Sequence, residues 1–599
     1  MRNSGKCVVC LDERSGLRGY LMTLTNMRGN LKSKLGVSEQ SMRVTVLTDR
    51  CAGCQECLVR CPTNALTMDS GNWTVLADNS ACVGCRQCVR TCPFSAITVE
   101  GPVLVSSREH TSPVHPQKLV GNLEETRSGF TTWVQAKAEA SRCLSCPDAT
   151  CVRGCPAHND IPSFIAAIRN DDLPEAHRIL RLTSFLPDIC SRVCDQALQC
   201  EGACTWSLAG GEGVAIGALE RFVTENAPVP PVEQLSDEGA GLKVAIVGSG
   251  PAGIAAAWEL AQASAMVTVF EKDENPGGLL KWGIPDFTLP DEIASRPWGA
   301  LLEAGVTLHC NSAIEVDGLD SLLQTFDAVV LAQGAGTPLR LPVEGGSLER
   351  VWDATRFLHE AQSAAVANRT LSDLTQEEDP SGVRIRTVLV VGAGNTAMDV
   401  ARLARRLGAR AICVDWMDRR FAPVRPDELD EASMEGVDIR FSTTIDHLEG
   451  TEGGLVMAHL NFTEQRSAGE LPVVVSKMAA TEVVDLVVMA MGYRVDASFS
   501  SVLPNSPISR KLQPGLTDRR WQASGLLAGG KPVFARSQPI GQLALGREIA
   551  YSHASSSVAD RVWVAGDVLV GPATVVEAMA QGRRAAQAIL NEWPLKKLN

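Results

Sequence analysis

The chain lacks long apolar runs and a surplus of basic residues, and each absence excludes a class of protein. No apolar run approaches the ~18 residues that a membrane-spanning helix needs. Residues 1–30 mix Arg2, Asp12 and other charged residues with apolar ones, so no signal-peptide core is expected. The formal charge of −13 argues against nucleic-acid binding, which needs a basic footprint. We therefore expect a cytoplasmic protein without a membrane span.

The chain is instead long and rich in glycine and cysteine. The 599 residues correspond to about four domains at ~150 residues each. The 51 glycines, combined with only 5% aromatic residues, suit an α/β protein with tight βα turns. The 20 cysteines are not expected to form disulfides, because a cytosolic chain is kept reduced. Sixteen of them lie between Cys51 and Cys204, and this density points to metal binding.

An internal repeat with an offset of 31 residues carries the first two groups of cysteines. Residues 51–68 and 82–99 each contain C-x2-C-x2-C-x3-C-P. This is the bacterial ferredoxin run, in which the fourth cysteine ligates the other cluster. Zinc is the alternative, but zinc sites usually use two separated C-x2-C pairs. The repeat therefore predicts two [4Fe-4S] clusters over residues 41–105. The expected ligands are Cys51, Cys54, Cys57 and Cys92 for one cluster, and Cys82, Cys85, Cys88 and Cys61 for the other.

A second cysteine-rich region follows a predicted linker, residues 106–130, which are rich in Ser, Thr, Pro and Gly. Between its two groups of cysteines, residues 161–186 place apolar side chains at helical spacing. We therefore expect a mostly helical unit with cysteines on its loops. These cysteines are Cys143, Cys146, Cys151, Cys155, Cys190, Cys194, Cys200 and Cys204.

The motif C-x2-C-x4-C-x3-C-P, followed by x-x-N-x-I-P, resembles the N-terminal domain of the glutamate synthase small subunit. The same domain occurs in dihydropyrimidine dehydrogenase and in the large subunit of NADH-dependent ferredoxin:NADP transhydrogenase. The resemblance implies one or two [4Fe-4S] clusters with interleaved ligands, and a Glu or Gln as one ligand, which Glu220 matches. A solvated helix glutamate is the alternative for Glu220, and Cys190 is expected to be a packed thiol. The implied ligands are Cys143, Cys146, Cys151 and Cys204 for one cluster, and Cys155, Cys194, Cys200 and Glu220 for the other.

Residues 243–271 form a dinucleotide-binding pattern of strand, G-x-G-x-x-G turn, helix and second strand. Gly248 permits the tight turn, Gly250 lets the backbone approach a pyrophosphate, and Gly253 allows close helix–strand packing. Glu271 ends the second strand, where it can accept a hydrogen bond from a ribose hydroxyl. Because all parts of the pattern occur in order, a glycine turn without a ligand is a weak alternative.

Two further segments resemble the same family and imply that the first dinucleotide is FAD. Residues 277–290 match a loop, G-G-x-L-x-x-G-I-P-x-F-x-L-P, that lies against the flavin in relatives. Residues 561–586 resemble the second FAD contact, where backbone N–H groups near Ala573 face the flavin ring. An ordinary turn residue is the alternative for the aspartate of that segment. The implied contacts are Gly278, Leu279, Asp567 and Thr574.

A second dinucleotide pattern, residues 387–416, lies between the two FAD segments and implies an inserted NAD(P)-binding domain. Asp415 stands 23 residues after Gly392, where an acid repels a 2′-phosphate and suits a ribose diol. The family has Tyr-Arg-Arg after this strand, whereas here Arg419 and Arg420 come later, so NADH is favoured over NADPH. A solvated loop pair is the alternative for these arginines. The expected contacts are Gly392, Gly394, Asn395, Thr396 and Asp415.

The predicted fold is multidomain α/β. Two Rossmann-like, disulfide-reductase-like nucleotide-binding domains follow an α-helical iron–sulfur domain and an α+β bacterial ferredoxin domain. The expected boundaries are 1–40 for an unassigned extension with Cys7 and Cys10, 41–105 for the ferredoxin-like domain, 106–130 for the linker, 131–240 for the helical domain, 241–345 and 491–599 for the FAD-binding halves, and 346–490 for the NAD(P)-binding domain.

This set of cofactors predicts a function. Nicotinamide exchanges electrons in pairs and iron–sulfur clusters exchange them singly, and a flavin converts between the two. The predicted enzyme is an NAD(P)H:acceptor oxidoreductase that exchanges electrons with ferredoxin or a partner redox subunit, in a hetero-oligomeric complex. An electron-bifurcating transhydrogenase subunit and a glutamate synthase small subunit that feeds a separate large subunit are the alternatives. A non-catalytic docking module is a third. No catalytic side chain is expected, because the cofactors carry the chemistry.

Overall fold

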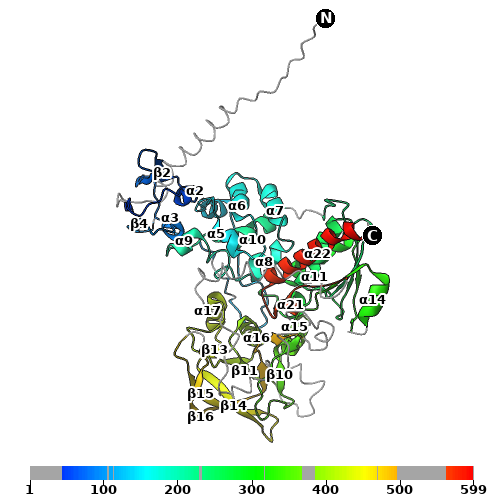
Figure 1. Cartoon of the computed structure of the whole chain (residues 1–599). Helices are drawn as coiled ribbons and strands as arrows, with labels where there is room; N and C mark the ends of the chain where they lie inside the picture. Colours follow the sequence, from blue (N-terminus) through cyan, green and yellow to red (C-terminus); the bar gives the residue numbers. More distant parts are fainter. Residues whose placement is uncertain are drawn as a thin grey trace.

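The computed structural model describes residues 43–103, 107–111, 114–115, 117–227, 232–315, 318–366, 385–467, 470–495 and 561–597. The predicted extension with Cys7 and Cys10 lies outside the described residues. Figure 1 shows a ferredoxin-like region at one end, followed by a helical region and two α/β regions. In the described part of the chain, no helix combines the length and the apolar character needed to cross a membrane.

The sequence repeat of the ferredoxin-like region is also a repeat of backbone conformation. Gly53 and Gly84, which are 31 residues apart, both have a left-handed φ, of 65° and 75°. Gln55 and Arg86 form the next such pair, at 65° and 56°, and each precedes a short helix. Two antiparallel pairs, β1 with β4 and β2 with β3, enclose the cysteines. The elements are β1 (Arg43–Val46), α2 (Glu56–Val59), β2 (Leu66–Asp69), β3 (Thr74–Ala77), α3 (Gln87–Thr91) and β4 (Ile97–Glu100).

The next region is helical, as expected. Side chains cap its two nine-residue helices, because Asp160 accepts from the Ser163 N–H and Asp172 from the Glu175 N–H, each with proline in the first turn. Two of the cysteines expected on loops lie within short helices instead, Cys151 in α5 and Cys190 in α8. The elements are α4 (Trp133–Ala140), α5 (Thr150–Gly154), α6 (Ile161–Arg169), α7 (Leu173–Arg181), α8 (Pro187–Val193), α9 (Thr205–Leu208) and α10 (Ile216–Asn226).

The first α/β region is a five-stranded parallel sheet in the order β19-β8-β5-β6-β7. The strand after residue 560, β19, joins the edge of this sheet beside β8, so segments more than 200 residues apart form one domain. Helices α11 and α22 lie side by side (Figure 1), and a Cβ at Gly582 would lie 2.0 Å from the Ala252 carbonyl oxygen. The elements are β5 (Lys243–Val247), α11 (Pro251–Gln262), β6 (Met266–Phe270), α12 (Leu279–Trp282), α13 (Asp291–Glu303), β7 (Thr307–His309), α14 (Leu319–Thr325), β8 (Ala328–Leu331), β19 (Val562–Val564), α21 (Asp567–Val570) and α22 (Val575–Lys597).

The second α/β region combines a parallel sheet, ordered β10-β17-β11-β12-β13, with an antiparallel sheet, β14-β15-β16. The two sheets share a core that includes Ile445, Leu448 and Leu460. A short pair, β9 with β18, lies where the chain passes between the two α/β regions. The elements are β9 (Thr337–Pro338), β10 (Val351–Asp353), α15 (Ala354–Val366), β11 (Thr387–Val391), α16 (Asn395–Arg406), β12 (Arg410–Val414), α17 (Pro426–Met434), β13 (Asp438–Arg440), β14 (Thr443–Gly450), β15 (Val456–Glu464), β16 (Val473–Val484), β17 (Leu486–Met489) and β18 (Tyr493–Arg494).

The described residues of the predicted linker bind across several regions. Arg127 pairs with Glu428 and Glu431 on α17, at 2.9 and 2.7 Å. The Thr126 N–H donates to the Phe287 carbonyl oxygen at 2.9 Å. Phe287 in turn lies beneath the guanidinium of Arg406, 4.3 Å from its ring centroid. This part of the predicted linker therefore holds the predicted flavin loop, residues 277–290, against α16 of the second α/β region.

Candidate cofactor sites

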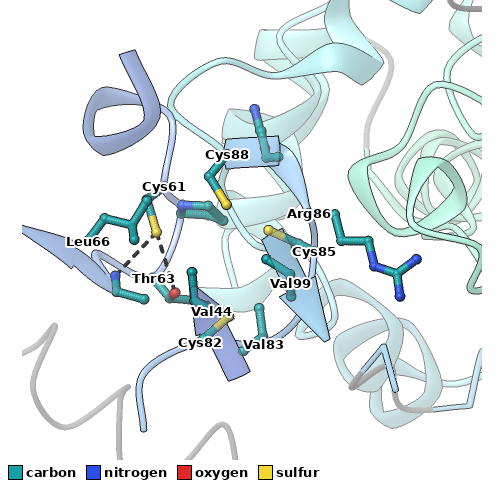
Figure 2. A pocket seen from close by; sticks show the side chains of 13 residues that line it. Val44, Cys61, Thr63, Leu66, Cys82, Val83, Cys85, Arg86, Cys88 and Val99 are labelled. Atoms are coloured by element: carbon teal, nitrogen blue, oxygen red, sulfur yellow. Dashed lines mark hydrogen bonds between the residues drawn. The ribbon is translucent and has the colours of Figure 1, made fainter. Parts of the chain in front are cut away.

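The fourth cysteine of the first ferredoxin motif reaches the cysteines of the second motif. Figure 2 shows Cys61 with the triplet of the second motif around one pocket, while Arg86 points away from it. The Ala65 N–H donates to the Cys61 Sγ at 3.2 Å. Burial, with a smaller contribution from the neighbouring cysteines, raises the pKa of Cys88 to about 12. Such a set of convergent thiols fits an iron–sulfur cluster, whose iron ions favour the thiolate form. The cysteines of this pocket are Cys61, Cys82, Cys85 and Cys88.

The other ferredoxin group repeats this arrangement. Burial raises the pKa of Cys57 to about 11, with smaller contributions from Cys54, Cys92 and Cys51. Cys92, the fourth cysteine of the second motif, therefore lies near the triplet of the first. The Ala96 N–H donates to Cys92 Sγ at 3.3 Å, which matches the bond to Cys61 in the first copy. Cys54 is exposed, so this group lies nearer the protein surface than the other.

A pocket in the helical region gathers the next four cysteines. Trp206 and Pro162 line its walls, and the Cys146 Sγ lies 3.3 Å from the Thr205 hydroxyl. Burial raises the pKa of Cys146 to about 12. The cysteines of this pocket are Cys143, Cys146, Cys151 and Cys204, which is the set that the family resemblance implies.

Glu220 is a buried carboxyl group near the remaining cysteines and not a solvated helix residue. It is 7% exposed, and its Oε1 has no hydrogen-bond partner among the described residues. Burial raises its pKa well above the usual range, with Cys190 raising it further. Cys155, Cys194 and Cys200 are buried and each lies close enough to feel its charge. A buried carboxylate without a partner is unfavourable, and a bound cation would offset that cost, so this group fits a mixed thiolate and carboxylate cluster site.

The glycines of the first dinucleotide motif each have a distinct steric role. Gly248 has φ +102°, and a Cβ there would lie 2.5 Å from the Ala332 carbonyl oxygen. A Cβ at Gly253 would lie 2.0 Å from the Gly248 carbonyl oxygen, so the helix could not pack on the turn. At Gly250, by contrast, no protein atom lies within 4 Å of a Cβ. The protein leaves that space open where a pyrophosphate would approach.

Glu271 lies at the end of β6 and organises the same turn. It is 4% exposed and accepts hydrogen bonds from the Ser249 N–H, at 3.0 Å, and from the Ser249 hydroxyl. That hydroxyl also accepts from the Gly277 N–H at 2.9 Å. A Cβ at Gly278 would lie 3.3 Å from the Gly250 Cα, and Leu279 begins the short helix α12. The acid, the glycine turn and the predicted flavin loop therefore form one connected unit.

Residues 567–577 of the C-terminal segment form the side of the predicted flavin site that adjoins the helical region. The Asp567 Oδ1 accepts from the Ala573 N–H at 3.2 Å. Glu577 accepts from the Thr574 N–H at 2.9 Å, so in this structure both predicted flavin-facing N–H groups meet carboxylates. The Gln199 Nε2 donates to the Thr574 hydroxyl at 3.2 Å. Gln199 directly precedes Cys200, so the predicted flavin site adjoins a cluster site.

The second dinucleotide motif has the same geometry as the first. Gly392 has φ +113°, and Gly394 has no protein atom within 4 Å of a Cβ. Asp415, at the end of β12, accepts from the Ala393 N–H and the Met417 N–H, both at 2.7 Å. This matches the Glu271 bond to Ser249 in the first motif. Asn395 begins α16 and accepts from the Arg425 N–H at 3.0 Å, and Thr396 follows it, half-buried.

Contacts between the ferredoxin-like and helical regions were not predictable from the motifs. Gln87, which lines the ferredoxin pocket, donates to the Asp148 carbonyl oxygen at 3.0 Å. The Thr205 hydroxyl, which lines the helical pocket, donates to the Gln87 Oε1 at 3.3 Å. The Arg60 Nε pairs with Asp148 at 2.7 Å. The two pockets are therefore joined through a hydrogen bond between their walls.

Three family models match the chain. Residues 50–96 match a 4Fe-4S dicluster domain, residues 119–229 match dihydropyrimidine dehydrogenase domain II, 4Fe-4S cluster, and residues 242–503 match pyridine nucleotide-disulphide oxidoreductase. The chain is thus a pyridine nucleotide oxidoreductase of the flavoprotein class that carries 4Fe-4S domains.

Relatives identify the family. The Escherichia coli glutamate synthase [NADPH] small chain is 30% identical over 478 residues, which cover 76% of this chain and 91% of the relative. The E. coli NAD-dependent dihydropyrimidine dehydrogenase subunit PreT is 30% identical over 475 residues, 78% of this chain and 96% of that one. The E. coli putative oxidoreductase UacF is 28% identical over 574 residues, 93% of this chain and 83% of that one. The chain belongs to the glutamate synthase small-chain family, as its cysteine and glycine motifs predicted.

Proposed function

We propose that this oxidoreductase is a linear relay between a pyridine nucleotide and a one-electron acceptor that docks at the ferredoxin-like region. Bound FAD would exchange a hydride with the nicotinamide and single electrons with iron–sulfur centres. The protein would set the positions of these cofactors and the order in which electrons pass between them. The observation that carries the proposal is the series of contacts that leads from the predicted flavin site through the helical region to the ferredoxin-like pocket.

The order of the sites follows from these contacts. Thr574 touches Gln199, beside the site of Cys155, Cys194, Cys200 and Glu220. That site adjoins the helical pocket through α5, where Cys155 donates its N–H to the Cys151 carbonyl oxygen at 3.1 Å. The helical pocket adjoins the pocket of Cys85 through Thr205 and Gln87. Four [4Fe-4S] clusters would fill this series, and the group with the exposed Cys54 would be the outermost.

The surface around the outermost group suits a redox partner. Trp73 is 68% exposed, and its carbonyl oxygen would lie 2.4 Å from a Cβ at Gly53, next to Cys54. Exposed apolar side chains of this kind are typical of protein-binding surfaces. We propose that ferredoxin or a partner redox subunit docks here, in a hetero-oligomeric complex. Other exposed apolar residues of the region are Val59, Leu76, Val89 and Phe94.

The enzyme should reduce a viologen dye with NADH or NADPH when it is purified without oxygen. Electrons would enter at the motif of Gly392 and leave through the iron–sulfur centres. The measurement is the anaerobic rise in dye absorbance after nucleotide is added. A sample fully loaded with iron and FAD that leaves the dye oxidised would contradict the relay.

NADH is the proposed nucleotide, because Asp415 occupies the position that would face a 2′-phosphate. Burial raises the pKa of Asp415 to about 6. The carboxyl is therefore charged above this value and becomes neutral as the pH falls through it, so its repulsion of a 2′-phosphate weakens toward acid. Arg420 offers little compensation, because it pairs with the neighbouring Asp418 at 2.9 Å.

The Asp415→Asn variant should discriminate less against NADPH than the unmodified enzyme. At pH 8 we expect the ratio of kcat/KM for NADH to that for NADPH to fall about tenfold, or ~1.4 kcal/mol. The difference between the two proteins should shrink below pH 6, where Asp415 is protonated. The 2′-phosphate titrates equally in both proteins, so their difference isolates Asp415. An unchanged ratio at pH 8 would contradict this role.

A further inference from the structure

Two histidines and a glutamate converge on the antiparallel sheet of the second α/β region, and none of the three belongs to a dinucleotide motif. His447 on β14 lies directly opposite His459 on β15 in the strand register. Their rings stack at 4.1 Å with an angle of 8° between their planes. Glu449, two residues along β14, lies 3.2 Å from the His447 Nε2 and 3.6 Å from the His459 Nε2. Strands β14–β16 lie at the lower end of Figure 1.

His459 is buried without hydrogen-bond partners. It is 9% exposed, and neither its Nδ1 nor its Nε2 has a hydrogen bond within the described residues. A buried polar ring left in this state costs free energy. Its Nε2 faces the Glu449 carboxylate, and one ligand atom from each of the three residues lies within 4.8 Å of the other two. A tetrahedral metal with bonds near 2.1 Å needs ligand atoms about 3.4 Å apart, so a small adjustment of the side chains suffices.

A carboxylate orients the second imidazole as metal sites commonly require. The His447 Nδ1 donates to Asp446 at 2.9 Å, which directs its Nε2 toward Glu449 in the shared space. Asp446 also accepts from the Asn461 amide at 2.8 Å. The strand register shifts between Ile445 and His447. Such a bulge re-aims side chains, so the consecutive residues Asp446 and His447 can contact each other. Carboxylate, histidine and metal in series are typical of zinc proteins.

We propose that His447, Glu449 and His459 bind one divalent late transition-metal ion, most suitably Zn²⁺. Two imidazoles and a carboxylate form a set that suits zinc or nickel and disfavours Mg²⁺, which prefers oxygen ligands alone. Three protein ligands leave one position for water. Because the ligands come from both strands of a hairpin, the ion would link β14 to β15. The alternative is a pair of protonated histidines held by the acidic side chains.

Zinc binding to the intact, iron- and FAD-loaded enzyme tests the site. After dialysis against a chelator under anoxia, the enzyme is equilibrated with Zn²⁺, passed through gel filtration and assayed for zinc per chain. We expect one zinc that His459→Gln and Glu449→Gln both lose, while His115→Gln, at an exposed histidine elsewhere, retains it. Ni²⁺ should compete for the site and Mg²⁺ should not. Asp446→Asn should weaken zinc binding by about 10- to 100-fold.

Thermal unfolding gives an independent readout. Zn²⁺ should raise the melting temperature of the unmodified enzyme and of His115→Gln, but not that of His459→Gln. Iron and FAD contents equal to those of the unmodified enzyme establish that a variant is folded. Equal zinc content in the unmodified enzyme and both ligand variants would overturn the proposal and leave the protonated pair as the explanation.

Discussion

Replacing Gly250 with alanine should give a folded protein that has lost its FAD. A Cβ at this position meets no protein atom within 4 Å, and Gly250 has an ordinary extended backbone, with φ −71° and ψ −172°. The fold itself therefore does not need a glycine there. A methyl group would instead occupy the space that the pyrophosphate needs. We expect FAD affinity to fall at least about 100-fold, or ~2.8 kcal/mol.

The flavin-to-protein ratio of purified samples and their circular dichroism spectra measure these two effects separately. Gly299→Ala on α13 is the matched control, because a Cβ there also meets nothing within 4 Å but lies away from the motif. Gly253→Ala should differ from both variants, because its Cβ would strike the Gly248 carbonyl oxygen and disturb the fold itself. A Gly250→Ala protein with full flavin content would show that no pyrophosphate approaches this turn.

Replacing Cys85 with alanine should interrupt electron delivery to a bulky acceptor while leaving the flavin end active. Cys85 lines the ferredoxin-like pocket whose wall residue Gln87 accepts a hydrogen bond from Thr205 of the helical pocket. Without its thiolate the cluster of that pocket is expected to be lost. NADH-driven reduction of cytochrome c, which reaches only the surface, should then fall to a small residual rate. Reduction of ferricyanide, which is small enough to accept electrons near the flavin, should persist.

Cys310→Ala is the control, because Cys310 is a partly exposed thiol at the end of β7 outside the four groups. Iron content separates the loss of one cluster from the collapse of the ferredoxin-like region. Cytochrome c reduction that survives in Cys85→Ala, with its cluster absent, would mean that electrons leave at another surface. Parallel loss of ferricyanide reduction would mean that the cluster supports the fold of the whole enzyme.

The local parts of the sites were predictable because short-range sequence determines them. Successive cysteines in each motif are separated by only two to four residues, so their thiols share one short stretch of chain, and the proline after the fourth cysteine turns the chain away. The left-handed backbone at Gly248 and Gly392 was predictable from the position of these glycines in the motif, because other residues are strained in that conformation. The acid at the end of the second strand follows from the length of the βα unit, and the structure gives Glu271 and Asp415 the same backbone contact.

Contacts between distant residues were not predictable, because no local pattern specifies which surfaces meet. Residues 106–130 have the composition of a linker, yet Arg127 in this segment binds α17 across the molecule. Gln199 carries no motif, and its contact with Thr574 requires two regions to pack together. The antiparallel sheet β14–β16 was also not foreseen.

The sequence alone determined the family, the kinds of cofactor and the residues that could hold them, because these depend on spacing along the chain. Only the tertiary structure decided which pocket walls touch, since those contacts join residues that are distant in the sequence. It also decided that His447 meets His459, because a strand register and one bulge bring together residues that the sequence leaves unrelated. Glu220 lies between these cases. Spacing suggested it, but burial without a partner is what distinguishes a ligand from a solvated glutamate.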